Sequence, residues 1–250
     1  DTSNLEEEGA QQISILSNRF HIKRRRLYDV LHVFEAIGCV KKSGLDSVKW
    51  IGKENIVTNL HNLKEQRGIN DPSKTLDEIF PDPCHVGISN LTIYFLLLFF
   101  AIKQDKVDIR YASQFFSRNT TRYKTTLCKL YQICYILGSI DVTSRTSQVC
   151  EIILNSPYYD EEVVPADPSE EETPIEGELA IKSEAGKNSQ SIDMSIQSLL
   201  NPPKENSEAL KRKPPSNLQF IYNRRRELRN YYTEFVKKTE ELPIVSEEEA

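Results

Sequence analysis

Four consecutive basic residues, Lys23 to Arg26, open a segment whose apolar residues have helical spacing. The planar guanidinium group of arginine can donate two parallel hydrogen bonds to the edge of guanine, a geometry that lysine cannot copy. Between residues 19 and 53 there are nine Lys or Arg against three Asp or Glu, in a chain whose net charge is -5. This local excess of positive charge indicates contact with nucleic-acid phosphates as well as with bases.

The residues around the basic run predict the scaffold that would position it. Ile13 and Leu16 indicate a short helix, and a second helix is predicted at 22–37. The expected buried stripe of that helix is Leu27, Val30, Leu31, Phe34 and Ile37. Gly38 suits the helix end, and strand-like runs at 39–42 and 48–51 predict a hairpin. Helix, helix and hairpin is the order of a winged helix, whose second helix inserts its N-terminal residues into the major groove.

The basic run also has a simpler interpretation. Four basic residues in a row are typical of a solvated helix face or a nuclear-import signal. Here the run begins the second helix of a helix–turn–helix pattern, and the hairpin after it carries Lys41, Lys42 and Lys49. We therefore favour DNA binding and expect these three lysines to contact the DNA backbone.

The second half of the chain repeats the same order of elements. Helices are predicted at 91–103, 107–116 and 121–137, and strand-like runs follow at 140–143 and 148–154. Gly138 is expected to close the last helix as Gly38 closes the earlier one. The repeat predicts duplication, and a mostly α fold with small β-hairpins (α+β) in two winged-helix domains, 1–55 and 89–155.

Three segments lie outside these domains. Residues 56–88 are predicted to be a polar connector with a short helix near 57–66. Residues 156–205 are expected to be a disordered acidic linker, with ten Asp or Glu against one Lys between 157 and 185. Residues 206–250 are a basic tail whose apolar spacing predicts a detachable amphipathic helix that would bind a protein partner. Its Arg224 to Arg226 run is interpreted as a solvated face or an import signal.

Other classes of protein find little support. The five cysteines form no CxxC pair and the four histidines lack metal-binding spacing, so we expect reduced thiols, no metal and no other cofactor. The longest apolar run, 91–102, is too short to span a bilayer. No nucleophile–base arrangement or phosphate-binding glycine loop indicates an enzyme. The chain opens on Asp1 rather than Met, so we expect a fragment, a processed form or an incomplete gene model.

The stretch from Lys23 to Gly52 resembles the DNA-binding domain of the E-two-F/DP cell-cycle transcription factors. The family hallmark, R-R-x-Y-D, falls on Arg25, Arg26, Tyr28 and Asp29, and its W-x-G strand end falls on residues 50–52. In that family the two arginines read the G/C core of an element close to TTTCCCGC. The resemblance implies base contacts for Arg25 and Arg26 and backbone contacts for Lys23, Arg24 and Tyr28. The family's first helix would lie upstream of the match.

The second half resembles the partner domain of the atypical branch of that family, in which one chain carries two DNA-binding domains and needs no DP partner. Residues 125–141 align with the hallmark in outline, but Cys128 and Lys129 replace the two arginines and Gln132 replaces the aspartate. These departures put base reading by this copy in question. The candidate phosphate contacts are Arg118, Arg122, Lys124 and Lys129. The alternative is a purely structural domain.

These features predict a nuclear transcription factor that binds double-stranded DNA at G/C-core promoter elements and regulates cell-cycle genes. Repression is favoured because the resemblance is to the atypical branch. No heptad pattern is sustained over three or more repeats, so we expect the two domains to pair within the chain; a DP-like partner or a homodimer are the alternatives. The rival function is a winged-helix scaffold in a chromatin or replication complex that binds DNA weakly or not at all.

Overall fold

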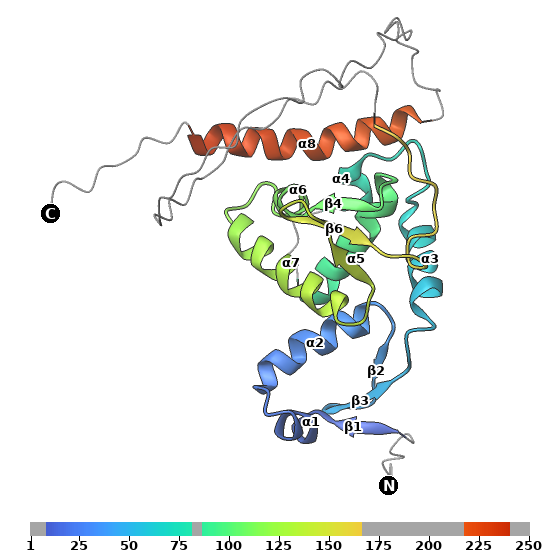
Figure 1. Cartoon of the computed structure of the whole chain (residues 1–250), viewed down its shortest axis with the longest axis vertical. Helices are drawn as coiled ribbons and strands as arrows, with labels where there is room; N and C mark the ends of the chain where they lie inside the picture. Colours follow the sequence, from blue (N-terminus) through green and yellow to red (C-terminus); the bar gives the residue numbers. More distant parts are fainter. Residues whose placement is uncertain (1–8, 82–86, 167–217, 241–250) are drawn as a thin grey trace, which may run out of the picture. The chain divides into compact units, whose positions relative to one another are not determined.

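The computed structural model describes residues 9–81, 87–166 and 218–240. Helices and short antiparallel strands make up this part of the chain, as the sequence predicted (Figure 1). In chain order they are β1 (Ala10–Gln12), α1 (Ile13–Arg19), α2 (Arg24–Ala36), β2 (Val40–Lys42), β3 (Ser47–Trp50), α3 (Ile56–Arg67), α4 (Leu76–Ile79), α5 (Ile88–Ala101), β4 (Lys106–Asp108), α6 (Ile109–Phe116), α7 (Tyr123–Gly138), β5 (Thr143–Arg145), β6 (Glu151–Leu154) and α8 (Gln219–Glu240).

Residues 9–52, here called the first module, fold much as their apolar spacing predicts. α2 buries Leu27 and Leu31 against Ile13 of α1 and the hairpin valines, Val40 and Val48. The sheet has the strand order β1-β3-β2, with both pairs antiparallel. β1 was not predicted, because three residues are too few to show an alternation of apolar and polar side chains.

Residues 88–154, here called the second module, repeat this architecture after α5. β4, α6, α7, β5 and β6 follow the order of β1, α1, α2, β2 and β3, and the second sheet has the matching order β4-β6-β5. β5 begins 103 residues after β2. The prediction that Gly138 closes the last helix is confirmed, but the same offset relates Gly38 (φ 81°) to Asp141 (φ 62°), so Gly138 does not occupy the place of Gly38. Gly138 is instead the last residue of α7, and the turn after it moves β5 to later residues than predicted.

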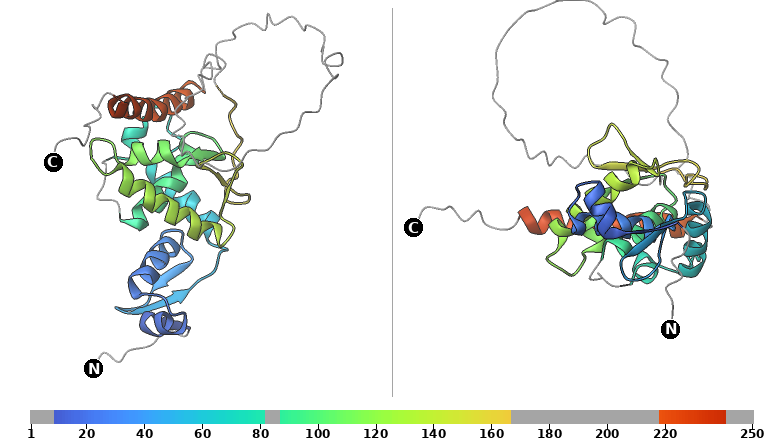
Figure 2. Two further views of the ribbon diagram at one scale, coloured as in Figure 1. Left: turned by 60° about the vertical axis from the view of Figure 1, so that its left-hand side comes forward. Right: turned by 90° about the horizontal axis from the view of Figure 1, so that it is seen from below.

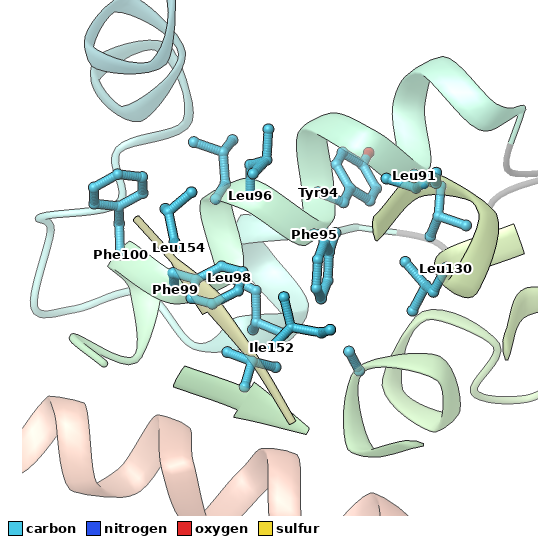
Figure 3. Packing of buried hydrophobic residues seen from close by; sticks show 14 of the residues in the cluster. Leu91, Tyr94, Phe95, Leu96, Leu98, Phe99, Phe100, Leu130, Ile152 and Leu154 are labelled. Carbon is cyan, nitrogen blue, oxygen red and sulfur yellow. The ribbon is translucent and has the colours of Figure 1, made fainter. Parts of the chain in front are cut away.

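α5 lies at the centre of the main core. Its residues from Phe95 to Ala101 are at most 1% exposed, and α2, α3, α6 and α7 all pack against it. Figure 3 shows the side chains of α5 among Leu130, Ile152 and Leu154. A helix that is apolar all round is buried all round. Among the described residues, no helix has the length and apolar character needed to cross a membrane.

The two modules share this core. Val33 of α2 and Ile37, its C-cap residue, belong to the same buried cluster as α5 and as Leu130 of α7. Leu27 and Leu31, on the other face of α2, belong to the smaller cluster of the first module. α2 therefore joins the two clusters, and the first module is not covered by its own residues alone.

In its described residues, 56–81 and 87–88, the segment predicted to be a polar connector is largely packed on the core. The expected short helix is present as α3, but it buries Ile56 and Leu60 in the main core, and Phe80 after α4 is also fully buried. α4 begins with a capping box in which Thr75 and Glu78 bond each other's backbone. The buried residues are scattered among charged ones, so average composition concealed them.

The segment after β6 also packs onto the core for longer than expected. Tyr159 stacks on Phe100 with ring centroids 5.3 Å apart, and Glu161 forms an ion pair with the buried Lys64. The described structure continues to residue 166. Of the disordered linker predicted at 156–205 and the basic tail at 206–250, residues 167–217 and 241–250 lie outside the described residues.

α8 is not the detachable helix that was predicted. It lies across α6 and α4 (Figures 1 and 2), and its Arg224 and Arg225 are only 2% and 6% exposed. Arg224 donates to the carbonyl oxygens of Ile69 (2.8 Å), Asp71 (2.7 Å), Lys74 (3.0 Å) and Ala101 (3.1 Å). Arg225 donates to those of Ile102 (2.8 Å), Lys103 (2.9 Å), Val164 (2.7 Å) and Pro165 (2.8 Å).

Some of these bonds meet the needs of a helix end. Ala101 is the last residue of α5 and Ile102 is its C-cap residue, whereas Ile69 lies beyond the end of α3. The last carbonyl groups of a helix have no partner within it and carry the negative end of the helix dipole, so a guanidinium group satisfies them and offsets that charge. At α4 the opposite end of a helix is satisfied by a negative group. The carboxylate of Glu227 accepts a hydrogen bond from the backbone N–H of Leu76, the first residue of α4, at 3.0 Å. Arg224 and Arg225, which were interpreted as part of a solvated run, are therefore buried and bonded to the core. This pair of arginines is called the clasp below.

We predict that Arg224→Ala lowers the free energy of unfolding by about 3 kcal/mol or more, because several buried carbonyl groups lose a charged donor at once. Urea titration followed by circular dichroism measures this. Lys237→Ala is the matched control: it removes an exposed cation from the same helix, α8, and we expect a change within about 0.5 kcal/mol. Equal stability of the two variants would contradict the clasp.

Candidate nucleic-acid interface

The predicted base-contacting residues lie on the first turn of α2. Lys23 is the N-cap residue of the helix, and Arg24, Arg25 and Arg26 are exposed. Leu27 and Leu31, one and two turns later, anchor the helix in the core of the first module. The first turn therefore projects three guanidinium groups from a fixed base, which is the arrangement that a recognition helix requires.

Arg26 is connected to the second module through Asp29. Its Nη1 donates to Oδ2 of Asp29 at 2.8 Å, and Nε2 of Gln132 on α7 donates to the same oxygen at 3.1 Å. Asp29 and Gln132 are 103 residues apart and so occupy equivalent places in the two modules. The Arg26 side chain is 61% exposed, and exposed ion pairs contribute only about 0–1 kcal/mol, so Arg26 can exchange Asp29 for a DNA group at small cost.

Arg24 and Tyr28 hold the turn of the hairpin against α2. Arg24 forms an ion pair with Asp46, and the Tyr28 hydroxyl donates to Oδ1 of Asp46 at 3.3 Å. Hydrogen bonds to Tyr28 and to Asp46 raise the pKa of Arg24 above its usual range. Asp46 was not among the predicted site residues, although it is the one acidic residue between the two predicted strands of the hairpin.

The lysines of the β2–β3 hairpin, here called the wing, lie on both faces of the sheet. Lys41 and Lys49 are opposite each other in the β2–β3 register, whereas Lys42 is opposite the buried Val48. Because neighbouring strand residues point to opposite faces, Lys41 and Lys49 face away from the α2 side. Lys42 lies on the α2 side, where its Nζ is 3.0 Å from Oε2 of Glu35.

In the second module, the structure separates Arg118 from the other candidates. Arg118 is 5% exposed, its Nε is 2.6 Å from Oδ1 of Asp77, and it also donates to the carbonyl oxygen of Phe80. A phosphate cannot reach a guanidinium group that is buried and bonded in this way, so the predicted phosphate contact by Arg118 is not retained. No local pattern indicated this burial, because it depends on residues 77–80 packing beside the end of α6.

The remaining candidates lie at or near the start of α7. Arg122 and Lys124 are exposed on either side of Tyr123, the first residue of the helix. Lys129 is partly buried and lines a polar hollow with Arg122, Thr120 and Thr125. Three of the four predicted cations of the second module thus lie close to the N-terminal end of its long helix.

The cysteines of the two modules differ in their exposure to solvent. Cys128, which is equivalent to Arg25, is exposed on α7. Cys39 and Cys134 are buried, and burial raises the pKa of the Cys39 thiol to about 11 and that of Cys134 to about 12. Across the described residues, no cluster of three or more His, Cys, Asp or Glu is arranged to hold a metal ion.

Comparison with known proteins identifies the first module. Residues 3–52 match the E-two-F/DP family winged-helix DNA-binding domain, and the match includes all the basic candidates from Lys23 to Lys49. A search of curated proteins finds no match to the chain. This match supports the interpretation of the chain as a DNA-binding transcription factor, and the matched family is generally non-enzymatic. Residues 3–52 of this chain are therefore similar to the winged-helix DNA-binding domain of the E-two-F/DP family.

Proposed function

We propose that this chain is a nuclear transcription factor that binds G/C-core promoter elements close to TTTCCCGC and represses cell-cycle genes. The observation that carries the proposal is the exposure of Arg25 and Arg26 on the first turn of a helix anchored by buried leucines. The match of residues 3–52 to the E-two-F/DP domain supports the DNA-binding part of this proposal.

The proposed mode of recognition follows from the chemistry of the first turn of α2. Arg25 and Arg26 enter the major groove, where each guanidinium group donates to O6 and N7 of a guanine. Lys23, Lys41, Lys42 and Lys49 attract the phosphate backbone, which sets affinity but carries no sequence information. Arg24 and Tyr28 add backbone contacts and, through Asp46, hold the wing in place against the helix.

We further propose that the second module is a degenerate winged helix that pairs with the first within one chain. The identical order of strands and helices, the shared core around α5 and the contact between Asp29 and Gln132 support this proposal. The second module then takes the place that a DP-like partner or a second copy would have. With Cys128 and Lys129 in place of arginines, α7 contributes phosphate contacts through Arg122, Lys124 and Lys129 rather than base contacts.

A scaffold that joins proteins in a chromatin or replication complex is the second candidate function. The loss of both arginines from α7 and the burial of Arg118 favour it, because they leave the second module with fewer groups for DNA. The two functions differ in one measurable property, the preference for a G/C-core duplex over a scrambled one.

We predict that the chain binds a TTTCCCGC duplex more tightly than a scrambled duplex in a gel-shift titration at two salt concentrations. Arg25→Ala and Arg26→Ala should each weaken specific binding by about 1–3 kcal/mol, since each removes a bidentate donor to guanine. Lys106→Ala, an exposed residue on β4, is the control that should leave binding unchanged. Equal affinity for both duplexes would mean sequence-blind phosphate contact, and no binding by folded protein would favour the scaffold.

We also predict that iodoacetamide at pH 8 alkylates Cys128 of the native protein well before Cys39 or Cys134. With a pKa of about 11, only about one Cys39 thiol in a thousand is ionised at that pH, and the thiolate is the reactive form. Mass spectrometry of the peptides measures the order. A saturating TTTCCCGC duplex should slow the alkylation of Cys128; an unchanged rate would mean that α7 does not face DNA.

A further inference from the structure

The end of α8 brings two more cations to the start of α7. The ring of Phe235 packs on Tyr123 with centroids 4.5 Å apart, and Tyr232 packs on Tyr111 of α6 at 4.6 Å. Tyr123 is the first residue of α7. Lys237 and Lys238 follow Phe235 by less than one helical turn, and both are exposed.

The position of these lysines is fixed by the clasp at the other end of the helix. Arg224 and Arg225 are bonded to backbone carbonyl groups of the core, and α8 continues without a break to Glu240. A continuous helix has one direction. Because Arg224 and Arg225 hold one end of α8 and Phe235 packs on Tyr123 near the other, the position of the last turn is determined. Lys237 and Lys238 are therefore neighbours of α7 in the folded chain, not parts of a loose tail.

A simpler explanation accounts for part of this arrangement. Lysines in the last turn of a helix offset the negative end of its dipole, which stabilises an exposed helix end whatever lies beside it. That effect needs no partner and no particular neighbour. It does not explain why the same turn lies against the part of the second module where Arg122 and Lys124 are exposed.

We propose that Lys237 and Lys238 extend the DNA-binding surface beyond α7 by contacting phosphates of double-stranded DNA next to the G/C core. The inference rests on the proposed function of the chain as a DNA-binding factor. Figure 1 shows the C-terminal end of α8 beside the first turns of α7, on the side where the N-terminal end of α2 also lies. Four exposed cations, Arg122, Lys124, Lys237 and Lys238, then compensate for the arginines that α7 lacks.

The test is a binding titration of the full chain with TTTCCCGC and scrambled duplexes over a range of salt concentrations. For each phosphate contact removed, the slope of log affinity against log salt falls by about 0.9. We expect Lys237→Gln and Lys238→Gln each to reduce the slope by about that amount, and the double variant by about twice as much. The affinity that the double variant loses should be about tenfold greater at 50 mM than at 200 mM salt, equally for both duplexes, because phosphates carry no sequence information.

Lys106→Gln is the matched control, because it removes one exposed positive charge at the start of β4 rather than beside α7. Its slope should equal that of the unaltered protein. If the unaltered chain binds the duplexes and the double variant keeps its slope, the inference about α8 is overturned while the proposed function stands. If Lys106→Gln changes the slope as much as Lys237→Gln, the lysines act only through net charge, and the inference is also overturned. No duplex binding by the unaltered chain overturns both.

Discussion

The burial of α5 is the constraint on which the rest of the structure depends. A helix with apolar side chains on every face cannot leave any face in water, and covering all of them takes several other elements. α2 of the first module and α7 of the second are among them, so one helix forces the two modules into a shared core. The guanidinium groups of Arg224 and Arg225 then satisfy the carbonyl end of α5, which no apolar residue can do.

This shared core has consequences for the candidate interface. α2 uses one face for its own hairpin and another for α5, which leaves its first turn, with Arg25 and Arg26, directed at solvent. The equivalent contact residues, Asp29 and Gln132, meet where the two long helices touch. Two related modules packed about equivalent residues provide paired surfaces without a second chain, in keeping with the pairing proposed for them.

The sequence was sufficient wherever the pattern was local. The helices of both modules, the hairpin at 39–51 and the exposure of Arg25 and Arg26 follow from apolar spacing and turn residues. Contacts over long distances in the chain were not predictable in this way. Arg118, Arg224 and Arg225 resembled solvent-facing cations because the carbonyl and carboxylate groups that bind them lie far away in the sequence. The hydrogen bonds of Asp46 and the pairing of Asp29 with Gln132 could not be predicted for the same reason.

The most direct test of the shared core is whether the two modules unfold together. Trp50 is the only tryptophan, and it packs edge-on against Phe34 in the first module at 5.6 Å, so its fluorescence reports that module alone. Circular dichroism at the helical band is dominated by the longer helices outside it. In a urea titration of the full chain, a shared core predicts that both signals change at the same midpoint with the same slope. A separate, earlier transition of Trp50 would contradict it, since that result requires a first module that opens while α5 stays covered.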